Sequence, residues 1–517
     1  MITEIEIAIL ANKLQQEEAL QKAIAKTIQI EVSSISHFEI LRRSIDARSK
    51  EIKINLALRV YIYPDTFQKE IPKAIPCLKS GCAKVIVCGS GPAGLFAAIE
   101  LLREGIQPIV LERGKNIHER KKDIALLQRC EIVNPDSNYA FGEGGAGTFS
   151  DGKLYTRSNK RGNIKEVLEC FVEHGADPNI LIDAHPHIGS DKLPKIVEQM
   201  RNTIINKGGL VYFNSKVIDF LIEKNRVVGV KTQDQKEYMA SAVILATGHS
   251  ARDIYQWFFE HKYAIQAKPF ALGVRLEHPQ KLIDTFQYHT SVRPHYLPPA
   301  EYSMVTQIQN RGVFSFCMCP GGLVIPATTQ EGLMLVNGMS NSMRSSAFAN
   351  AGMVVSVQTE DYKKFDEYGA LAGVKFQENL EQAMFIAAGK SQKAPAQRMT
   401  DFVNGKYSIE LAPSSYHLGL KSVKMDEILP HFVSQSLKEA FKIFENKKRG
   451  FLSPDAMLLG LESRTSSPVQ ILRDPQSMEH IQIHALYPIG EGAGYAGGIT
   501  SSAIDGINCA RKIAQQI

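Results

Sequence analysis

The sequence predicts a protein of the α/β class, and three observations support this prediction. A short apolar run, Val85 to Val87, is followed at once by closely spaced glycines and then by an apolar pattern with helical spacing. A second run of this kind lies at residues 242–245. Further glycine-rich segments lie at residues 142–147 and 490–498, and glycines allow a backbone to come close to a ligand. Continuous apolar runs are typical of parallel strands that are buried on both faces.

Residues 84–114 carry the strongest motif. Gly89, Gly91 and Gly94 form the pattern G-x-G-x-x-G directly after the predicted strand. Gly89 allows a tight turn, Gly91 lets N–H groups approach a pyrophosphate, and Gly94 lets the next helix pack closely on the strand. Glu112 ends the following strand, where a carboxylate accepts hydrogen bonds from a ribose. Strand, glycines, helix and acid in this order predict a Rossmann-like dinucleotide site.

Composition narrows the classes of function. The chain has 517 residues, of which 44% are hydrophobic and 22% charged, and its formal charge is +6. This length predicts about two to four domains. The basic clusters at 120–122 and 447–449 are short and lack interleaved aromatic residues, so nucleic acid is not the expected partner. The chain has no long apolar run, and its eight cysteines are scattered, which predicts a soluble cytoplasmic protein without a membrane partner.

Residues 1–80 are expected to form a small N-terminal α/β module. Residues 5–9 read as a strand, residues 17–26 and 34–41 as helices, and residues 52–63 as a long strand with partial alternation. We find no catalytic constellation in this module. Its role is open at this point.

The rest of the chain divides into three parts. Residues 81–254 are expected to form the first part of the dinucleotide-binding domain, which ends after the buried strand at 242–248. Residues 255–455 mix short strands with helices, which predicts an inserted α+β domain on the substrate side. Residues 456–517 return to the first domain through a glycine-rich turn and a helix of small residues.

Two further G-x-G-x-x-G patterns do not fit a second dinucleotide domain. One lies in the segment 141–157, at Gly142, Gly144 and Gly147, and the other begins at Gly492. Neither follows a buried strand that leads into a helix in the required way. The first is better explained as a loop that lies against the bound cofactor. A nicotinamide cofactor would therefore bind only transiently, without a domain of its own.

Three separated segments resemble the FAD proteins of the glutathione-reductase type: 84–114, Ala246-Thr247-Gly248 and Gly490-Glu491. More specifically, the chain is similar to a family of uncharacterised FAD-dependent dehydrogenases over nearly its whole length. This likeness is carried by the segments 142–157, 246–253, 273–279, 316–322 and 462–468. It implies a Rossmann-like, three-layer FAD-binding domain and redox chemistry, but it does not indicate a substrate.

The resemblance also implies which residues hold FAD. Val217 would present its backbone to the adenine, and Glu491 stands where many relatives have Asp, one methylene shorter. Gly498 and Ile499, at the start of the last helix, would lie near N1 and O2 of the flavin. No metal is expected. The full set of expected FAD-binding residues is Gly89, Gly91, Pro92, Ala93, Gly94, Glu112, Arg113, Gly145, Thr148, Asp151, Gly152, Lys153, Val217, Ala246, Thr247, Gly248, Gly490, Glu491, Gly498 and Ile499.

The reactive candidates remain open. Cys317 and Cys319 have three interpretations: a redox pair, buried packing thiols, or metal contacts. The strain of a disulfide across one residue argues against the redox pair. His249 follows the cofactor-facing strand and is a candidate proton donor, or a structural histidine. The same two interpretations apply to His185, His187, His289 and His417. Lys153, Arg275 and Arg464 are candidate contacts for a carboxylate or a nicotinamide phosphate, or are solvated or paired with nearby acids.

We therefore expect an FAD-dependent oxidoreductase that transfers a hydride between the flavin and a small organic substrate. NAD(P)H is a possible transient reductant, and an electron-transfer protein is a possible partner. Two alternatives remain open. One is an FAD-dependent RNA-modifying enzyme, which predicts salt-dependent RNA binding. The other is a flavin-binding sensor or interaction protein, whose flavin no metabolite reduces.

Overall fold

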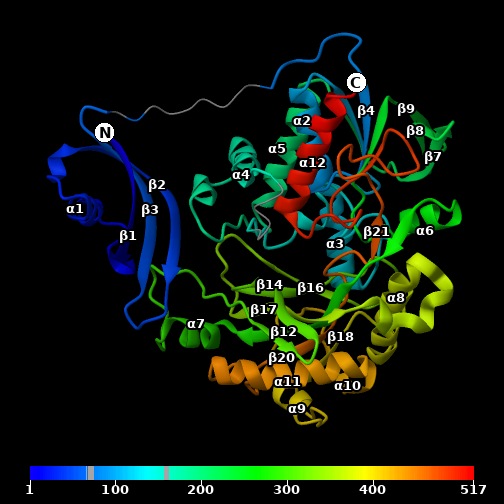
Figure 1. The fold of residues 1–517 in the computed structure, drawn as a ribbon. Helices are drawn as coiled ribbons and strands as arrows, with labels where there is room; N and C mark the ends of the chain where they lie inside the picture. The colour runs from blue at the N-terminus through cyan, green and yellow to red at the C-terminus, as the bar shows by residue number, and fades with distance from the viewer. Residues whose placement is uncertain (66, 68–74, 156–161) are drawn as a thin grey trace.

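The computed structural model of the chain describes residues 1–65, 67, 75–155 and 162–517, so the end of the loop expected at 141–157 lies outside the described residues. The element at its centre is a five-stranded parallel sheet with the order β22-β10-β4-β5-β6 (Figure 1). Both apolar runs of the sequence lie in this sheet, which confirms the α/β class. The strands are β4 (Lys84–Cys88), β5 (Gln107–Leu111), β6 (Leu210–Tyr212), β10 (Ala242–Leu245) and β22 (Leu486–Pro488).

Helices and a second sheet cover the two faces of the parallel sheet. Helices α2 (Pro92–Arg103), α5 (Leu193–Asn206) and α12 (Ile499–Ala514) lie side by side on one face (Figure 1). The antiparallel sheet of β7 (Val217–Glu223), β8 (Arg226–Thr232) and β9 (Glu237–Met239) contacts β10 from the other face. This is the predicted Rossmann-like, three-layer arrangement.

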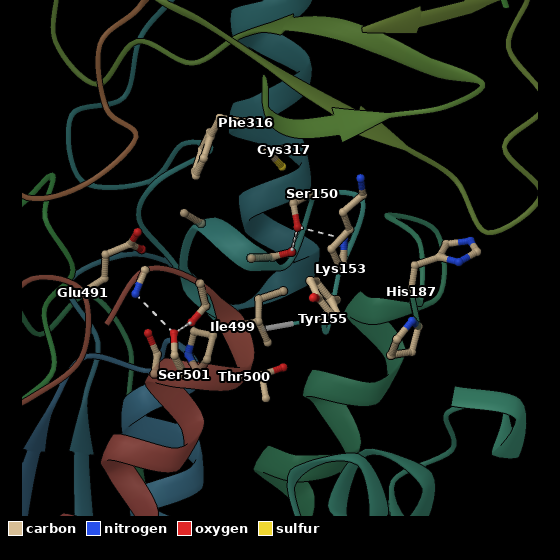
Figure 2. Close-up of a pocket in the computed structure, with 18 of the residues that line it drawn as sticks. Ser150, Lys153, Tyr155, His187, Phe316, Cys317, Glu491, Ile499, Thr500 and Ser501 are labelled. Carbon is tan, nitrogen blue, oxygen red and sulfur yellow. Dashed lines mark hydrogen bonds between the residues drawn. The ribbon is translucent and has the colours of Figure 1, made fainter. Parts of the chain in front are cut away.

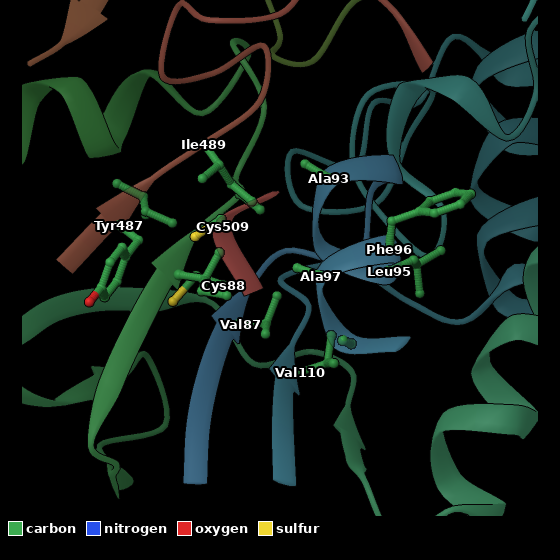
Figure 3. Packing of buried hydrophobic residues seen from close by; sticks show 14 of the residues in the cluster. Val87, Cys88, Ala93, Leu95, Phe96, Ala97, Val110, Tyr487, Ile489 and Cys509 are labelled. Carbon is green, nitrogen blue, oxygen red and sulfur yellow. The ribbon is translucent and has the colours of Figure 1, made fainter. Parts of the chain in front are cut away.

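The core of this domain is built from small and aliphatic side chains. Val87 and Val110 of the sheet and Leu95 and Phe96 of α2 belong to one core cluster, and all four are at most 3% exposed (Figure 3). Helix α12 comes very close to α2 at Gly506, where a Cβ atom would lie only 2.2 Å from the carbonyl oxygen of Ala93. This close contact holds the N-termini of both helices at the same edge of the sheet.

The inserted region has a seven-stranded sheet with the order β13-β14-β17-β12-β20-β18-β19. Its pairs are antiparallel except β18 with β19, and helices α8 (Ala372–Ala387) and α11 (His431–Lys447) pack against it. The region is therefore mixed α+β, as predicted. Its strands, with a hairpin β15–β16 beside the sheet, are β12 (Phe270–Pro279), β13 (Val305–Ile308), β14 (Arg311–Cys319), β15 (Gly322–Pro326), β16 (Val336–Ser340), β17 (Phe348–Val357), β18 (Ala394–Arg398), β19 (Leu420–Ser422) and β20 (Met457–Glu462).

Strand pairing corrects the boundaries expected at 254/255 and 455/456. Strand β11 (Ile265–Ala267) pairs with β21 (Val469–Ile471), and the preceding helix α6 (Arg252–Glu260) packs into the core of the Rossmann-like domain. Strand β20 pairs with β12 and β18, so it belongs to the insertion. The insertion therefore extends from β12 to β20. A short strand does not reveal its pairing partner in its own sequence, which is why both boundaries were misplaced.

The N-terminal module is a three-stranded antiparallel sheet with the order β1-β3-β2 and one helix, α1 (Glu17–Ile28). The strands are β1 (Ile2–Leu10), β2 (Ile35–Asp46) and β3 (Lys53–Ile62). The helix expected at 34–41 is wrong, because these residues form the start of β2. Its Ile35, Phe38 and Ile40 suit a strand, and β3 supplies the pairing partner.

The remaining elements connect these three units. No helix in the part of the chain that the structure describes is both long and apolar enough to cross a membrane. The α-helices are α3 (Ile117–Cys130), α4 (Ile164–Glu173), α7 (Gln280–Tyr288), α9 (Met399–Val403) and α10 (Met425–Ile428), and the 3₁₀ helices are η1 (Ala11–Lys13), η2 (Val32–Ser34), η3 (Gly145–Gly147), η4 (Pro178–Leu181) and η5 (Thr359–Leu371).

Candidate active site

One continuous cavity of about 1360 Å³ lies where the three units meet. The carboxyl ends of β4, β5 and β10 and the N-termini of α2 and α12 form its first side, which we call the cofactor half. The opposite side, which we call the far wall, is formed by the loop at 150–155, the segment 183–187, the inserted region and the N-terminal module. Ligand pockets usually measure about 300–1000 Å³, so the cavity has room for more than one small ligand.

The glycines after β4 form the floor of the cofactor half. A Cβ atom on Gly89 would lie 2.5 Å from the carbonyl oxygen of Ala246, and one on Gly94 only 1.9 Å from that of Gly89. These two positions therefore require glycine for packing. Gly91 differs, because a Cβ there would meet only the Cα atom of Gly145, at 3.8 Å. Gly91 thus faces open space at the N-terminus of α2, where a phosphate group fits.

Glu112 holds together the loops that form this half of the cavity. Its carboxylate accepts hydrogen bonds from the Ser90 N–H (2.9 Å) and hydroxyl (2.7 Å), and from the N–H groups of Gly114 (2.9 Å) and Gly142 (3.0 Å). A carboxylate has about four acceptor positions, and protein donors already use four. The ribose contact predicted for Glu112 therefore requires a ribose hydroxyl to share or replace one of these bonds.

The other end of the cofactor half lies at the N-terminus of α12. Figure 2 shows Ile499, Thr500 and Ser501 along one side of the pocket, with Glu491 beside them. A Cβ atom on Gly498 would meet nothing within 4 Å, so this N-cap residue also faces open space. The free N–H groups of the first helical turn point to the cavity and favour negative charge there.

His249 and Glu491 meet in the cofactor half. The His249 Nδ1 atom lies 3.6 Å from a Glu491 carboxylate oxygen, and both side chains line the cavity. They come from the loops after β10 and β22, which are neighbouring strands. His249 is therefore paired and faces the cavity, as a proton donor requires.

Most of the expected FAD-binding residues line this cavity. Gly94 lies beneath it, and two others face away from it. Thr148 donates a hydrogen bond to the Glu143 carbonyl (2.9 Å), and Asp151 is fully buried and accepts one from Arg344 (3.2 Å). Both therefore support the loop from behind. The expected residues on the cavity surface are Gly89, Gly91, Pro92, Ala93, Glu112, Arg113, Gly145, Gly152, Lys153, Val217, Ala246, Thr247, Gly248, Gly490, Glu491, Gly498 and Ile499.

The far wall contains residues that the sequence did not single out. The inserted region contributes the aromatic side chains of Tyr288, Tyr296 and Phe316, and the loop at 150–155 adds Ser150 and Tyr155. Figure 2 shows Phe316, Ser150 and Tyr155. These three lie in segments that carry the family resemblance, but no pattern there marks them as cavity residues. Their roles arise only because distant segments meet, and a sequence of this kind gives no signal for such contacts.

The N-terminal module closes one side of the far wall. Arg42, Ser44 and Ile45 of β2 line the cavity. The neighbouring Arg43 donates its N–H to the carbonyl of Ile182 (2.7 Å), and its guanidinium pairs with Asp183 at 2.6 Å. The module, which showed no catalytic residues in its sequence, thus forms part of the chamber.

A charged cluster lies within the far wall, where the 150–155 loop meets the inserted region. Glu301 pairs with His185 and lies 3.8 Å from the Lys153 ammonium. Burial alone would raise the pKa of Glu301, but the hydrogen bond with His185 and the charge of Lys153 outweigh it and lower the pKa to about 2. Glu301 is therefore ionised, and the amine of Lys153 lies beside it at the cavity surface. His187 lines the cavity nearby.

A buried ion network supports the junction between the cofactor half and the insertion. Glu381 of α8 is fully buried and accepts hydrogen bonds from Arg252 (3.0 Å) and Arg464 (2.9 Å). Burial opposes ionisation of Glu381, but the two guanidinium groups lower its pKa to about 2. Arg464 reaches the cavity surface, yet its charge is balanced by Glu381.

The other candidates lie away from the cavity surface. Arg275 is fully buried behind the far wall, and Cys319 lies beside it. His289 hydrogen-bonds to the carbonyl of Ala47 in the module at 3.2 Å, and His417 is exposed. Cys317, by contrast, lies on the far wall.

Among the described residues, one cluster has metal-ligand chemistry: Cys170, Glu173 and His174, at the C-terminal end of α4. His174 Nδ1 already bonds to the Cys170 carbonyl at 2.6 Å, and Glu173 lies 3.5 Å from Arg103. These partners explain the cluster without a metal ion.

Comparison with known proteins identifies the family. The chain is 39% identical over 516 residues to an uncharacterised protein of Clostridium beijerinckii, and the alignment covers 96% of each chain. Residues 269–465 match the family described as FAD-dependent protein, C-terminal domain-like, and residues 82–130 match an FAD-binding domain. The chain belongs to this family of FAD-dependent proteins.

Other matches are partial. Residues 1–61 match a domain of unknown function, and residues 190–286 match the family named glucose inhibited division protein A. A tRNA uridine 5-carboxymethylaminomethyl modification enzyme of Streptococcus sanguinis is 38% identical over 55 residues, which is 11% of this chain and 9% of that protein. Among solved structures, CtdE in complex with FAD is 12% identical, covers 84% of each chain and has a TM-score of 0.34. FqzB is also 12% identical, covers 86% of this chain and 78% of its own, and has a TM-score of 0.36.

FAD is therefore the cofactor of this FAD-dependent protein, and the residues of the cofactor half fit it. A side chain at Gly91 or at Gly498 would fill the open space there. Both glycines are N-cap residues, and helix N-termini favour the negative charge of a phosphate or a reduced flavin. The family and the cavity together describe an FAD-dependent oxidoreductase.

Proposed function

We propose that this oxidoreductase transfers a hydride between FAD and a small organic substrate that binds against the far wall. One observation carries the proposal: a single cavity joins the cofactor half to the far wall. FAD supplies the two-electron chemistry when it is bound. A substrate on the far wall would share one chamber with it and be screened from bulk solvent by the N-terminal module.

The protein groups have separate tasks in this proposal. The glycine turn at Gly89–Gly91 binds the pyrophosphate through the N-terminus of α2. The first turn of α12, at Gly498 and Ile499, stabilises negative charge on the reduced ring. His249, held by Glu491 at 3.6 Å, holds or donates the proton that accompanies the hydride. Lys153 and Tyr155 are placed to bind a polar group of the substrate.

The finer relationship to the glutathione-reductase type is also part of the proposal. It is supported by the way three distant segments, after β4, β10 and β22, line one cavity. We find no second dinucleotide domain among the described residues, so NAD(P)H would enter the far half of the cavity transiently. We further expect the protein to act in the cytoplasm, and an electron-transfer protein remains a possible partner.

Anaerobic titration of the purified holoprotein with NADH and then with NADPH tests the proposal. The absorbance of oxidised flavin near about 450 nm should bleach with one of the two. If neither bleaches it, a screen of small alcohols, amines and hydroxy acids follows in the same assay. A flavin that none of these reduces contradicts the proposed oxidoreductase and favours the sensor alternative.

RNA modification is the second candidate function. The match to a tRNA-modifying enzyme over 55 residues favours it, although that match covers only 11% of the chain. An RNA-modifying enzyme should bind tRNA with an affinity that falls steeply as salt rises. Binding of tRNA at about physiological salt would promote this alternative, and its absence would remove it.

A further inference from the structure

Cys317 and Cys319 are the reactive groups that the proposed function leaves without a task. Cys317 is partly buried and lines the cavity, whereas Cys319 is fully buried. In Figure 2, Cys317 projects from the wall that carries Phe316, and Ile499 and Ser501 of the cofactor half lie on the other side of the pocket. Cys317 thus faces the space between the far wall and the expected flavin site.

The backbone around Cys317 departs from a regular strand. Strand β14 pairs with β17 up to Phe316–Gly352 and again at Cys319–Asn350, so β14 carries one extra residue there. Cys317 itself has φ of +45°, a left-handed conformation that is strained for a residue other than glycine. Bulges next to active sites re-aim side chains. Packing thiols do not require such a backbone.

A buried cation lies beside both cysteines. Arg275 is fully buried, and its Nη2 atom donates to the Cys317 carbonyl (2.8 Å) and to the Cys319 sulfur (3.4 Å). Its Nη1 atom donates to Glu462 at 2.9 Å. Burial opposes the charge of Arg275, but Glu462 raises its pKa above the usual range, so the guanidinium stays positive. This positive charge lowers the pKa of both thiols.

The thiols differ in acidity in a way that suits a two-step exchange. The pKa of Cys317 is lowered to about 6, chiefly by its hydrogen bond with Cys319. Burial and the charge of Asp151 raise this pKa, but the charges of Arg275 and Lys153 lower it further. The same hydrogen bond and burial raise the pKa of Cys319. A nucleophilic thiolate therefore faces the cavity, and a protonated thiol lies behind it.

We propose that Cys317 and Cys319 form a thiol–disulfide centre in the wall of the flavin cavity, which accepts a low-molecular-weight disulfide as substrate. The proposal goes beyond the hydride transfer proposed above. A Cys-x-Cys disulfide is strained, but strained disulfides are the ones that are easily reduced again, as an exchanging pair requires.

The chemistry balances as a thiol–disulfide exchange. The Cys317 thiolate attacks one sulfur of the substrate disulfide, the new S–S bond forms, and the first substrate thiolate leaves. The Cys319 sulfur then attacks Cys317, expels the second substrate thiolate and closes the Cys317–Cys319 disulfide. The proton of Cys319 passes to one leaving thiolate, and the other leaving thiolate takes a proton from solvent, which balances the proton that Cys317 lost when it ionised. Two electrons and one proton then return the pair to a thiolate and a thiol, and reduced FAD bound in the cofactor half would supply the electrons.

Alkylation of the reduced holoprotein tests the acidity of Cys317. Iodoacetamide is added at several pH values, and each cysteine is followed by peptide mass spectrometry. The exposed Cys130 in the same chain is the internal reference. At pH 6, Cys317 should react about tenfold faster than Cys130, because its larger thiolate fraction outweighs its lower nucleophilicity.

Exchange with 2-hydroxyethyl disulfide tests the pair. The wild type should form a Cys317–Cys319 disulfide, Cys319→Ser should trap a mixed disulfide on Cys317, and Cys317→Ser should form neither. The flavin spectrum of both variants reports that they are folded. These measurements need neither NAD(P)H nor turnover, so their failure is distinct from failure of the proposed function. Alkylation of Cys317 no faster than of Cys130 at pH 6, or no disulfide between the pair, overturns the proposal.

Discussion

The two sides of the cavity are built in different ways. The cofactor half depends on short local motifs, and its central glycine turn lies within the six residues 89–94. The far wall is assembled from the 150–155 loop, the segment 183–187, the inserted region and the N-terminal module. The cofactor half is fixed by backbone geometry, because helix N-termini and glycines bind a phosphate whatever the other side chains are. The far wall depends on side chains brought together by tertiary packing. A cofactor site can thus be shared by many proteins while the opposite wall sets what each one acts on.

Replacing Gly91 by Leu should have the largest effect and should be confined to the cofactor half. The backbone at Gly91 tolerates a Cβ atom, so the fold should persist, but the side chain would occupy the space for the pyrophosphate. We expect FAD affinity to fall by about a hundredfold or more. Flavin content per chain after gel filtration measures the loss of FAD, and circular dichroism measures whether the fold persists.

Gly94→Leu is the contrasting variant. Its Cβ atom would lie 1.9 Å from the Gly89 carbonyl oxygen, so we expect this variant to fail to fold, and not merely to lose the cofactor. If Gly91→Leu keeps a full complement of FAD, the assignment of the glycine turn to the pyrophosphate is wrong.

Replacing Glu381 by Gln should destabilise the junction between the two halves. The change leaves two buried guanidinium groups, Arg252 and Arg464, without their carboxylate, at a cost of about 3 kcal/mol. The pKa of Glu381 is lower in the folded protein, about 2, than the roughly 4.3 of the unfolded chain. Its stabilisation is therefore present above about pH 4.3 and is lost as the pH falls towards 2.

Thermal unfolding of the wild type and of Glu381→Gln, at several pH values, measures this effect. The difference in Tm should be large at pH 7 and shrink below about pH 4. Glu378→Gln is the matched control on the same helix, since Glu378 is only half-buried and lies 3.6 Å from Arg252. Equal effects of the two substitutions would contradict the network.

Replacing Arg43 by Ala should have the smallest effect and touch only the far wall. It removes a partly buried pair with Asp183, worth about 1 kcal/mol, from the contact that holds the module. The amide of Ala184, which donates to the Arg43 carbonyl at 2.9 Å, should exchange its hydrogen faster, with FAD content unchanged. Arg59→Ala, which removes an exposed pair within the module, is the control. No change in exchange at Ala184 would show that the module is held by other contacts.

The sequence predicted the cofactor half better than the far wall, for a physical reason. The Val85–Val87 strand, the glycines and Glu112 all belong to one short strand–helix–strand unit, so their order in the sequence is informative. Even here, two predicted residues, Thr148 and Asp151, turned out to support the loop from behind. Sequence spacing does not tell which side of a loop a side chain takes.

The far wall escaped prediction because it depends on long-range pairing. The sequence of residues 34–41 has a helical pattern, but these residues pair with β3 as part of a strand. The same strand places Arg42 at the cavity. Strand β20 was placed outside the insertion because its partners β12 and β18 are far away in the sequence. Cys317 was visible as a candidate, but its bulge and its buried neighbour Arg275 were not.

The most direct test of the account is to count the electrons that the oxidised holoprotein accepts. In the proposed arrangement, FAD binds in the cofactor half, and Cys317 faces it from the far wall with Cys319 buried behind it. After treatment with 2-hydroxyethyl disulfide, anaerobic titration with dithionite should consume about four electrons per FAD in the wild type and about two in Cys317→Ser. A wild type that accepts only about two electrons would show that the far wall holds no second redox centre and would contradict the account.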